Sequence, residues 1–436
     1  MIYSLLIAVM IILLATIYIF HSDLTSPAFL LTVAFMLAVS CCCLYANEWK
    51  FHDYRLIAVV VSGLLGFVVF SAITYMYDMK GKKTKKIQLV PVEINSLKLC
   101  IYLLFQVALY TYYSYILLKN IGTFSFAFLS NAIGASYEAG KGYGSALINI
   151  GNIVNMPGIY YIIYVAVNNL VCKKKNHRAV YLNILVGMFG ALLSGTRTTL
   201  FMYIIAIIVL YIILKQRQNG WTKNINIKNV IKGCLVLAIL ILLFNILFTL
   251  QGRKVSDLTV VDLLANYLGA PIKNLELFIL DGKVKTNAVG TITFSDTYSW
   301  INKFYGKNEI SIPSVYKYRW VNGKILGNVY TQFMPLYNDF GIAGTFFIMG
   351  LLGWLCQKVY DKIKLCNRNM QVDFCLLIYS YMSFAIIFCF FSNKFFELII
   401  ARAMIYFVVG IIAFDIFFRK LHIRGKSLVI MLDKKK

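Results

Sequence analysis

The sequence predicts an all-α polytopic membrane protein with about 11 transmembrane helices, in the range of roughly 10 to 12, and one large extracytoplasmic loop. The composition of the chain and its recurring apolar stretches carry this prediction. Of the 436 residues, 60% are hydrophobic and 15% are aromatic, while only 14% are charged. An ordinary soluble domain does not have this composition. Apolar stretches of the roughly 20 residues that a spanning helix needs also recur along the chain.

The predicted spans are continuous apolar stretches separated by polar connections. The first lacks the basic start and the cleavage site of a signal peptide, so it counts as a span. The spans lie near residues 2–20, 27–46, 55–77, 98–118, 156–172, 179–194, 199–215, 230–250, 338–357, 372–391 and 399–418. The chain then divides into helices one to eight (1–250), a large outer loop (251–337), helices nine to eleven (338–418) and a basic tail (419–436).

Charge predicts which connections lie on which side. The chain has 43 Lys and Arg against 18 Asp and Glu. More than half of the basic residues lie in or beside alternate connections, which the positive-inside rule assigns to the cytoplasm together with the C-terminus. These connections are 80–86, 173–178, 215–228, 358–368 and 419–436, and the outer ones are 119–155, 195–198, 251–337 and 392–398.

The first two connections fit this pattern less well. Residues 21–26 would lie inside without a Lys or Arg, and residues 47–55 would lie outside with two. An extra or a missing span near the start would remove the mismatch.

Composition also argues against several classes of site. No basic stretch has the pattern of a nucleic-acid-binding fold, so the positive charge predicts orientation and lipid contact. All ten cysteines fall in predicted spans or on the inner side, which implies no disulfide framework. The run Cys41–Cys43 has no nearby histidine and its side chains point apart on a helix, so we expect no metal and no other cofactor.

The long outer segment 251–337 has two notable parts. Residues 256–268 begin with a capping serine and place apolar residues on one face, which predicts an interfacial amphipathic helix that Pro271 ends. Residues 294–324 mix aromatic with polar and basic residues. That mixture suits stacking on sugar rings, and it equally suits the aromatic belt of a membrane protein.

Four arginines lie near predicted outer helix mouths. Arg197 separates two apolar runs, Arg253 follows span eight, Arg319 lies in the long loop and Arg402 lies about one turn inside span eleven. The planar guanidinium binds phosphate oxygens through paired hydrogen bonds, so these arginines are candidates to hold one anion. The alternative for each is a snorkelling side chain or a loop ion pair.

Few outer carboxylates are available as a general base. Asp339 and Glu397 lie at outer helix mouths, and Asp339 is alternatively a helix cap. Histidine is nearly excluded on the outer side, where only His52 is expected. The other outer carboxylates are Glu138, Asp257, Asp262, Glu276, Asp281, Asp296 and Glu309.

Two motifs carry a resemblance to a known family. "SGTR" at 194–197 opens a transmembrane hairpin, and "GNVYTQFMPLYNDFGIAG" at 327–344 follows the long outer loop into span nine. In this order and setting, over roughly residues 150–420, the chain resembles the bacterial Wzy-type oligosaccharide repeat-unit polymerases of O-antigen and capsular polysaccharide.

The resemblance implies a metal-independent membrane glycosyltransferase with a C-type fold in the bacterial cytoplasmic membrane. Such an enzyme transfers a growing glycan from undecaprenyl diphosphate onto an incoming lipid-linked repeat unit at the outer face. Donor and acceptor are both undecaprenyl-diphosphate-linked oligosaccharides, and membrane lipid, a flippase and a chain-length regulator are the implied partners.

The motifs also imply site residues. "SGTR" matches Arg197 to an arginine of the family, with Arg253 as a weaker second contact, while Arg319 and Arg402 come from the placement of the arginines. The second motif adds Tyr330, Asn338 and Asp339. The related ligases use a loop histidine, and this chain has none between 251 and 337. Asp339 and Glu397 therefore both remain candidates for the general base.

A transporter is the alternative, either a lipid-linked oligosaccharide flippase or a polysaccharide exporter. Transporters typically show internal repeats and polar residues through the depth of their spans. The sequence shows no clear repeat and no charged track at the middle of the bilayer, and transport leaves the large outer loop unexplained.

Overall fold

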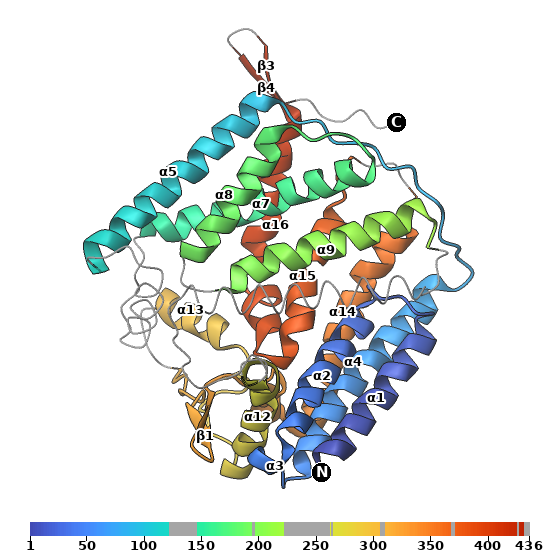
Figure 1. The fold of residues 1–436 in the computed structure, drawn as a ribbon, viewed down its shortest axis with the longest axis vertical. Coiled ribbons are helices and arrows are strands. Elements are labelled where there is room, and N and C mark those ends of the chain that lie inside the picture. Colours follow the sequence, from blue (N-terminus) through green and yellow to red (C-terminus); the bar gives the residue numbers. More distant parts are fainter. Residues whose placement is uncertain are drawn as a thin grey trace.

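The computed structural model describes residues 1–121, 146–193, 197–221, 262, 265–305, 310–367, 371–424 and 427–430. Within these ranges the chain is built of helices, with two small antiparallel hairpins (Figure 1). The first half contains α1 (Ile2–Ile19), α2 (Pro27–Leu44), α3 (Ala46–Trp49), α4 (Arg55–Met79), α5 (Ser96–Ile121), α7 (Ala146–Val171), α8 (Arg178–Leu193) and α9 (Thr198–Gln218).

The second half contains one long helix, several shorter helices and short helical turns. Its helices are η1 (Ala265–Gly269), α12 (Ala270–Asp281), α13 (Ser295–Tyr305), α14 (Phe333–Leu365), α15 (Phe374–Ile387), η2 (Phe388–Phe390), η3 (Phe395–Ile399), α16 (Arg402–Asp415) and η4 (Ile416–Lys420). The hairpins pair β1 (Arg319–Val321) with β2 (Lys324–Gly327), and β3 (Leu421–Arg424) with β4 (Ser427–Ile430).

By length and composition, seven of the described helices can cross a membrane: α1, α2, α4, α5, α7, α9 and α14. Two shorter apolar helices are α8 and α15 with its extension η2. The predicted all-α, multi-pass architecture is confirmed at this level. The predicted span 230–250 lies outside the described residues, so the count of about 11 stays a prediction.

Helix α14 packs along α4 with very close backbone approach. A side chain at Gly66 would meet the carbonyl oxygen of Phe346 at 2.1 Å, and one at Gly353 would meet the carbonyl oxygen of Phe67 at 2.3 Å. Only glycine fits at these two positions. Gly341 interrupts α14 with φ 71° and ψ −169°, so residues 333–340 form a separate first segment that leads out of the long loop.

Contacts between distant connections fall into two groups, which lie at opposite ends of the helices (Figure 1). The first group, which we call the basic end, joins residues 21–26, 78–98, 168–178, 215–221, 358–367, 371–373 and 415–421. For example, Lys358 donates to Asp78, and Arg217 pairs with Asp373. This group includes the four predicted inner connections before the tail, and it also includes 21–26.

The second group, which we call the loop end, joins residues 45–55, 262, 265–295, 315–341 and 389–397. Backbone N–H groups of His52 and Asp53 donate to Glu276, and Lys324 pairs with Glu48. In Figure 1 the α3, α12 and β1 elements lie together near the N-terminus, far from the C-terminus and β3–β4. These contacts therefore keep the described parts of the predicted inner connections apart from the described parts of the long outer loop, and which end faces the cytoplasm stays a prediction.

Two predicted elements are wrong in detail. Pro271 does not end the helix predicted for 256–268, because η1 runs directly into α12 and Pro271 lies in the first turn of α12. Proline is tolerated there since a first-turn N–H has no helical partner. Most of 256–264 lies outside the described residues.

The predicted span 399–418 is not one helix. Ala401 is extended, with φ −143° and ψ 167°, and it separates η3 from α16. The turn before this break is held to the loop end, because the side chain of Gln332 accepts a hydrogen bond from the Phe395 N–H at 3.1 Å. Arg402 is therefore the first residue of α16, and the prediction that it lies one turn inside a helix is wrong.

Candidate functional site

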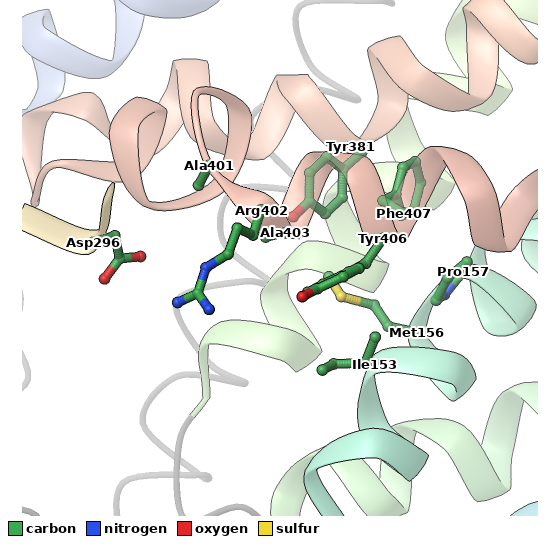
Figure 2. Close-up of a pocket in the computed structure, with 10 residues that line it drawn as sticks. All are labelled: Ile153, Met156, Pro157, Asp296, Tyr381, Ala401, Arg402, Ala403, Tyr406 and Phe407. Carbon is green, nitrogen blue, oxygen red and sulfur yellow. The ribbon is translucent and has the colours of Figure 1, made fainter. Parts of the chain in front are cut away.

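A pocket of about 330 Å³ opens where α7, α13, α15 and α16 meet (Figure 2). It combines two charged side chains with an apolar and aromatic wall. The lining residues are Ile153, Met156, Pro157, Asp296, Tyr381, Ala401, Arg402, Ala403, Tyr406 and Phe407. Small-molecule sites typically have this mixture of apolar walls and a few polar groups.

Arg402 provides the positive charge of the pocket. In Figure 2 its guanidinium lies between the carboxylate of Asp296 and the ring of Tyr406. As the first residue of α16, Arg402 stands where the helix dipole also favours an anion. Of the predicted site residues that the structure describes, Arg402 is the one that lines this pocket.

Packed aromatic rings fix the far wall. The rings of Tyr381 and Phe407 stack with centroids 4.2 Å apart, and Tyr160 on α7 meets both rings edge-on. Tyr160 and Tyr381 are buried, whereas Tyr406 is 45% exposed. The pocket therefore has a rigid inner wall and one adjustable aromatic side chain at its rim.

Pro157 lies in the same wall. It lies inside α7, where proline has no N–H to donate to the carbonyl oxygen of Ile153 one turn earlier. Ile153 itself lines the pocket. Pro157 also packs on α16, since a side chain at Gly410 would meet its ring at 2.3 Å. The proline thus joins α7 closely to α16 at the pocket.

Several charges act on Asp296. Desolvation raises the pKa of its carboxyl above the usual value, and the negative charge of Glu397 raises it further, while Arg402 and Lys394 act in the opposite direction. Glu397 is 41% exposed and pairs with Lys394. Two carboxylates and two basic groups, from α13, the start of η3 and α16, therefore form one electrostatic cluster around Asp296.

Tyr316 connects this cluster to Asp339. The pKa of the Tyr316 phenol is raised by desolvation, then by the charges of Glu397 and Asp339. The two carboxylates predicted as candidate bases therefore act on the same phenol. The Tyr316 ring also lies 5.9 Å from the ring of Tyr330.

The side chains of Arg319 and Tyr330 are hydrogen-bonded to each other. The Arg319 Nε donates to the Tyr330 hydroxyl at 2.9 Å, and its Nη2 donates to Asp281 at 2.6 Å. The Tyr330 hydroxyl in turn donates to the carbonyl of Lys317 at 2.9 Å. These bonds hold the 315–321 segment on α12, so Arg319 occupies a loop ion pair, the alternative named above.

Asn338 and Asp339 hold two loop segments against α14. Asn338 exchanges hydrogen bonds with the backbone of Val284 at 2.7 and 3.1 Å. Asp339 accepts one from the Thr293 N–H at 2.8 Å and one from Asn338 at 3.1 Å. Each carboxylate oxygen of Asp339 thus accepts one hydrogen bond. The bond from Thr293 also positions the segment just before α13.

Arg197 lies at the start of α9, is 9% exposed and faces the ring of Tyr267 at 5.6 Å. The Tyr267 ring stacks on Phe391, with centroids 6.3 Å apart. Arg197 is therefore at the loop end, as predicted, on the aromatic segment that precedes η3. Arg253 lies outside the described residues.

Sequence reasoning did not single out Tyr316, Tyr381 or Tyr406, and it gave Asp296 no priority among the outer carboxylates. The signal for Tyr316 and Asp296 was their position in the aromatic segment 294–324. Tyr381 and Tyr406 lie in apolar helices, where a tyrosine carries no distinguishing pattern, and only the packing of α15 on α16 reveals them.

Comparisons with family models, with curated proteins and with solved structures found no match to this chain.

Proposed function

We propose that this chain is a membrane glycosyltransferase that polymerises undecaprenyl-diphosphate-linked oligosaccharide repeat units into a surface polysaccharide. The reaction takes place at the outer face of the bacterial cytoplasmic membrane. The observation that carries the proposal is the pocket in which Arg402 and Asp296 stand beside an apolar wall. A lipid diphosphate sugar combines an anion, a sugar and a hydrocarbon tail, and this pocket offers a matching surface for each.

Arg402 binds the diphosphate in this proposal. Its guanidinium provides paired donors for phosphate oxygens, and the N-terminus of α16 adds its dipole. Ile153 and Tyr406, which line the pocket, are 42% and 45% exposed, so the apolar side of the pocket continues to the helix surface. The first isoprene units of the carrier fit there.

Asp296 is the carboxylate that we assign to proton transfer. The pKa of its carboxyl is raised towards neutral pH, and a general base works best when its pKa lies near the working pH. Asp296 therefore suits this role better than an aspartate with an ordinary pKa. Asp339 has both oxygens occupied by hydrogen bonds, and Glu397 pairs with Lys394. Glu397 tunes Asp296 electrostatically and remains the second candidate.

The transfer step forms one glycosidic bond and breaks one bond to the diphosphate. The acceptor sugar hydroxyl gives its proton to Asp296, and its oxygen forms a bond to the anomeric carbon of the donor glycan. The bond between that carbon and the diphosphate oxygen breaks, and undecaprenyl diphosphate leaves with the electron pair. Arg402 stabilises the negative charge that grows on the leaving oxygen.

The proposal is tested by replacing Arg402 in purified protein supplied with lipid-linked repeat units. Arg402→Gln should reduce chain extension by about 100-fold or more, as loss of a charge-stabilising donor typically does. Arg402→Lys should also be impaired, because lysine lacks the planar fork. The matched control is Arg55→Gln, since Arg55 is an exposed loop-end arginine paired with Asp53. Equal activity of the Arg402 and Arg55 variants would contradict the proposal.

A further inference from the structure

A second pocket lies at the basic end, away from the site described above. It has a volume of about 220 Å³ and opens between residues 92–94, the start of α5, the end of α7 and the start of α8. Lys174, Lys175 and His177 line it together with a single acidic residue, Glu93. The space is enough for several water molecules of about 30 Å³ each.

The charged side chains of this pocket give it a net positive charge. Glu93 pairs with Lys174, but its side chain is 78% exposed, and such an exposed ion pair is weak. His177 accepts the Ala179 N–H on its Nδ1 at 3.2 Å, so its Nε2 carries the proton and is a donor. An anion entering the pocket would meet two lysines and this donor.

Asparagine side chains fix the walls of the pocket. Asn169 accepts from the Val92 N–H at 2.7 Å and donates to the Val92 carbonyl at 2.8 Å. Asn169 also donates to Asn176, and Asn176 donates to the carbonyl of Ala166 at 3.0 Å. Both asparagines are buried, so the pocket is preformed and binding need not order its walls.

The helices that frame the pocket present apolar side chains to their surroundings. Leu97 and Ile101 on α5 are 58% and 48% exposed, and Leu182 and Leu185 on α8 are 48% and 61% exposed. Helices α5 and α8 pack against each other. Both helices therefore line the pocket with one side and, on another side, expose apolar side chains of the kind that contact acyl chains.

We infer that this pocket binds the phosphate headgroup of an anionic phospholipid, with the acyl chains along α5 and α8. Basic pockets between membrane helices bind acidic headgroups by attraction to clustered lysines. The exposed apolar side chains of these two helices favour a lipid over a free phosphate, because a soluble anion would make no use of them. The inference is independent of the proposed glycosyl transfer.

The test compares lipid retention by the detergent-purified full chain, measured by native mass spectrometry after exchange into mixed phosphatidylglycerol and phosphatidylcholine. The wild type should retain phosphatidylglycerol preferentially. The double variant Lys174→Gln/Lys175→Gln should lose this preference by roughly fivefold for each lysine removed. The matched control is Lys82→Gln/Lys83→Gln, which removes two exposed lysines of the same end outside the pocket.

Three results would overturn the inference. These are equal retention of the two lipids by the wild type, an equal loss in the control variant, and displacement of phosphatidylglycerol by millimolar inorganic phosphate. The last would identify a site for a soluble anion. Unchanged thermal unfolding of both variants in phosphatidylcholine, which carries no net charge, separates lost binding from lost folding.

Discussion

Lys364 on α14 donates a hydrogen bond to Asp23 at 2.8 Å, although the two residues are 341 positions apart. Both side chains are less than 10% exposed, and the Tyr360 hydroxyl donates to the same carboxylate at 2.8 Å. The turn 21–26 therefore lies with the basic connections and obtains its positive partner from α14. This explains why the turn needs no Lys or Arg of its own.

The Asp23–Lys364 pair should be important for stability. Asp23→Asn leaves the Lys364 ammonium buried without a counter-charge, which typically costs about 3–5 kcal/mol. Thermal unfolding in detergent measures the loss. The control is Asp53→Asn, because its partner Arg55 is 55% exposed and such pairs contribute about 0–1 kcal/mol. Equal losses of thermal stability in the two variants would show that the ion pair of Asp23 stabilises the fold no more than an exposed pair does.

The two groups of contacts predict which residues impermeant reagents can reach. Ser311 is exposed in the long loop segment, and Lys83 is exposed at the basic end. In intact cells, Ser311→Cys should react with an impermeant thiol reagent and Lys83→Cys should react only after the membrane is opened. Both cysteines should be introduced into a chain whose native cysteines are replaced. The reverse pattern would invert the orientation that the basic residues predict.

Asp296 predicts a specific dependence of activity on pH. A raised pKa means that Asp296 takes up its proton at a higher pH than an ordinary aspartate, whose pKa is about 3.9. On acidification, chain extension should therefore begin to fall at a pH above that value. Glu397→Gln removes one cause of the shift and should move this decline to lower pH. Complete inactivity of Glu397→Gln at every pH would instead identify Glu397 as the base.

The stability of the Asp296→Asn variant provides the control. Because the pKa of Asp296 is raised on folding, the folded chain binds the proton more tightly than the unfolded chain. The contribution of Asp296 to the stability of the fold is therefore lost as the pH rises through the pKa that Asp296 has in the folded chain. Asp296→Asn should then unfold at the same or a higher temperature near neutral pH. Lost activity with unchanged stability separates a chemical role from a structural one.

Arg197 should be required through its shape as well as its charge. Arg197→Ala should abolish chain extension at unchanged protein level, and Arg197→Lys should be impaired because lysine has no planar face to lay on Tyr267. Tyr267→Phe keeps the aromatic face and should stay close to the wild type. The length of the polymer on a gel measures chain extension by all three variants. A full ladder from Arg197→Ala would show that Arg197 is not required for chain extension.

Much of the fold follows from local sequence. Apolar runs predict the helices because backbone groups in a bilayer must be satisfied within the segment, and alternating basic connections predict the two ends. The break at Ala401 could not be predicted in this way, since it falls inside an apolar run that reads as one continuous helix. The same holds for Pro271, which fits either the end or the start of a helix.

The candidate site is predicted less completely. The family-like motif contains Asp339 and Tyr330, yet the contacts of these residues hold loop segments. The pocket itself contains Arg402 and Asp296. Which outer carboxylate meets which arginine depends on how α13 lies against α16. That placement comes from packing between segments about a hundred residues apart, and no local pattern encodes it.

The central claim is tested most directly by giving the purified wild-type chain, in a lipid bilayer disc, only the lipid-linked repeat unit as substrate. The account predicts products of two and more repeat units on the lipid carrier, with one undecaprenyl diphosphate released for each unit joined. Unchanged single repeat units, in a preparation that instead moves the same substrate across a sealed bilayer, would contradict it and identify a transporter.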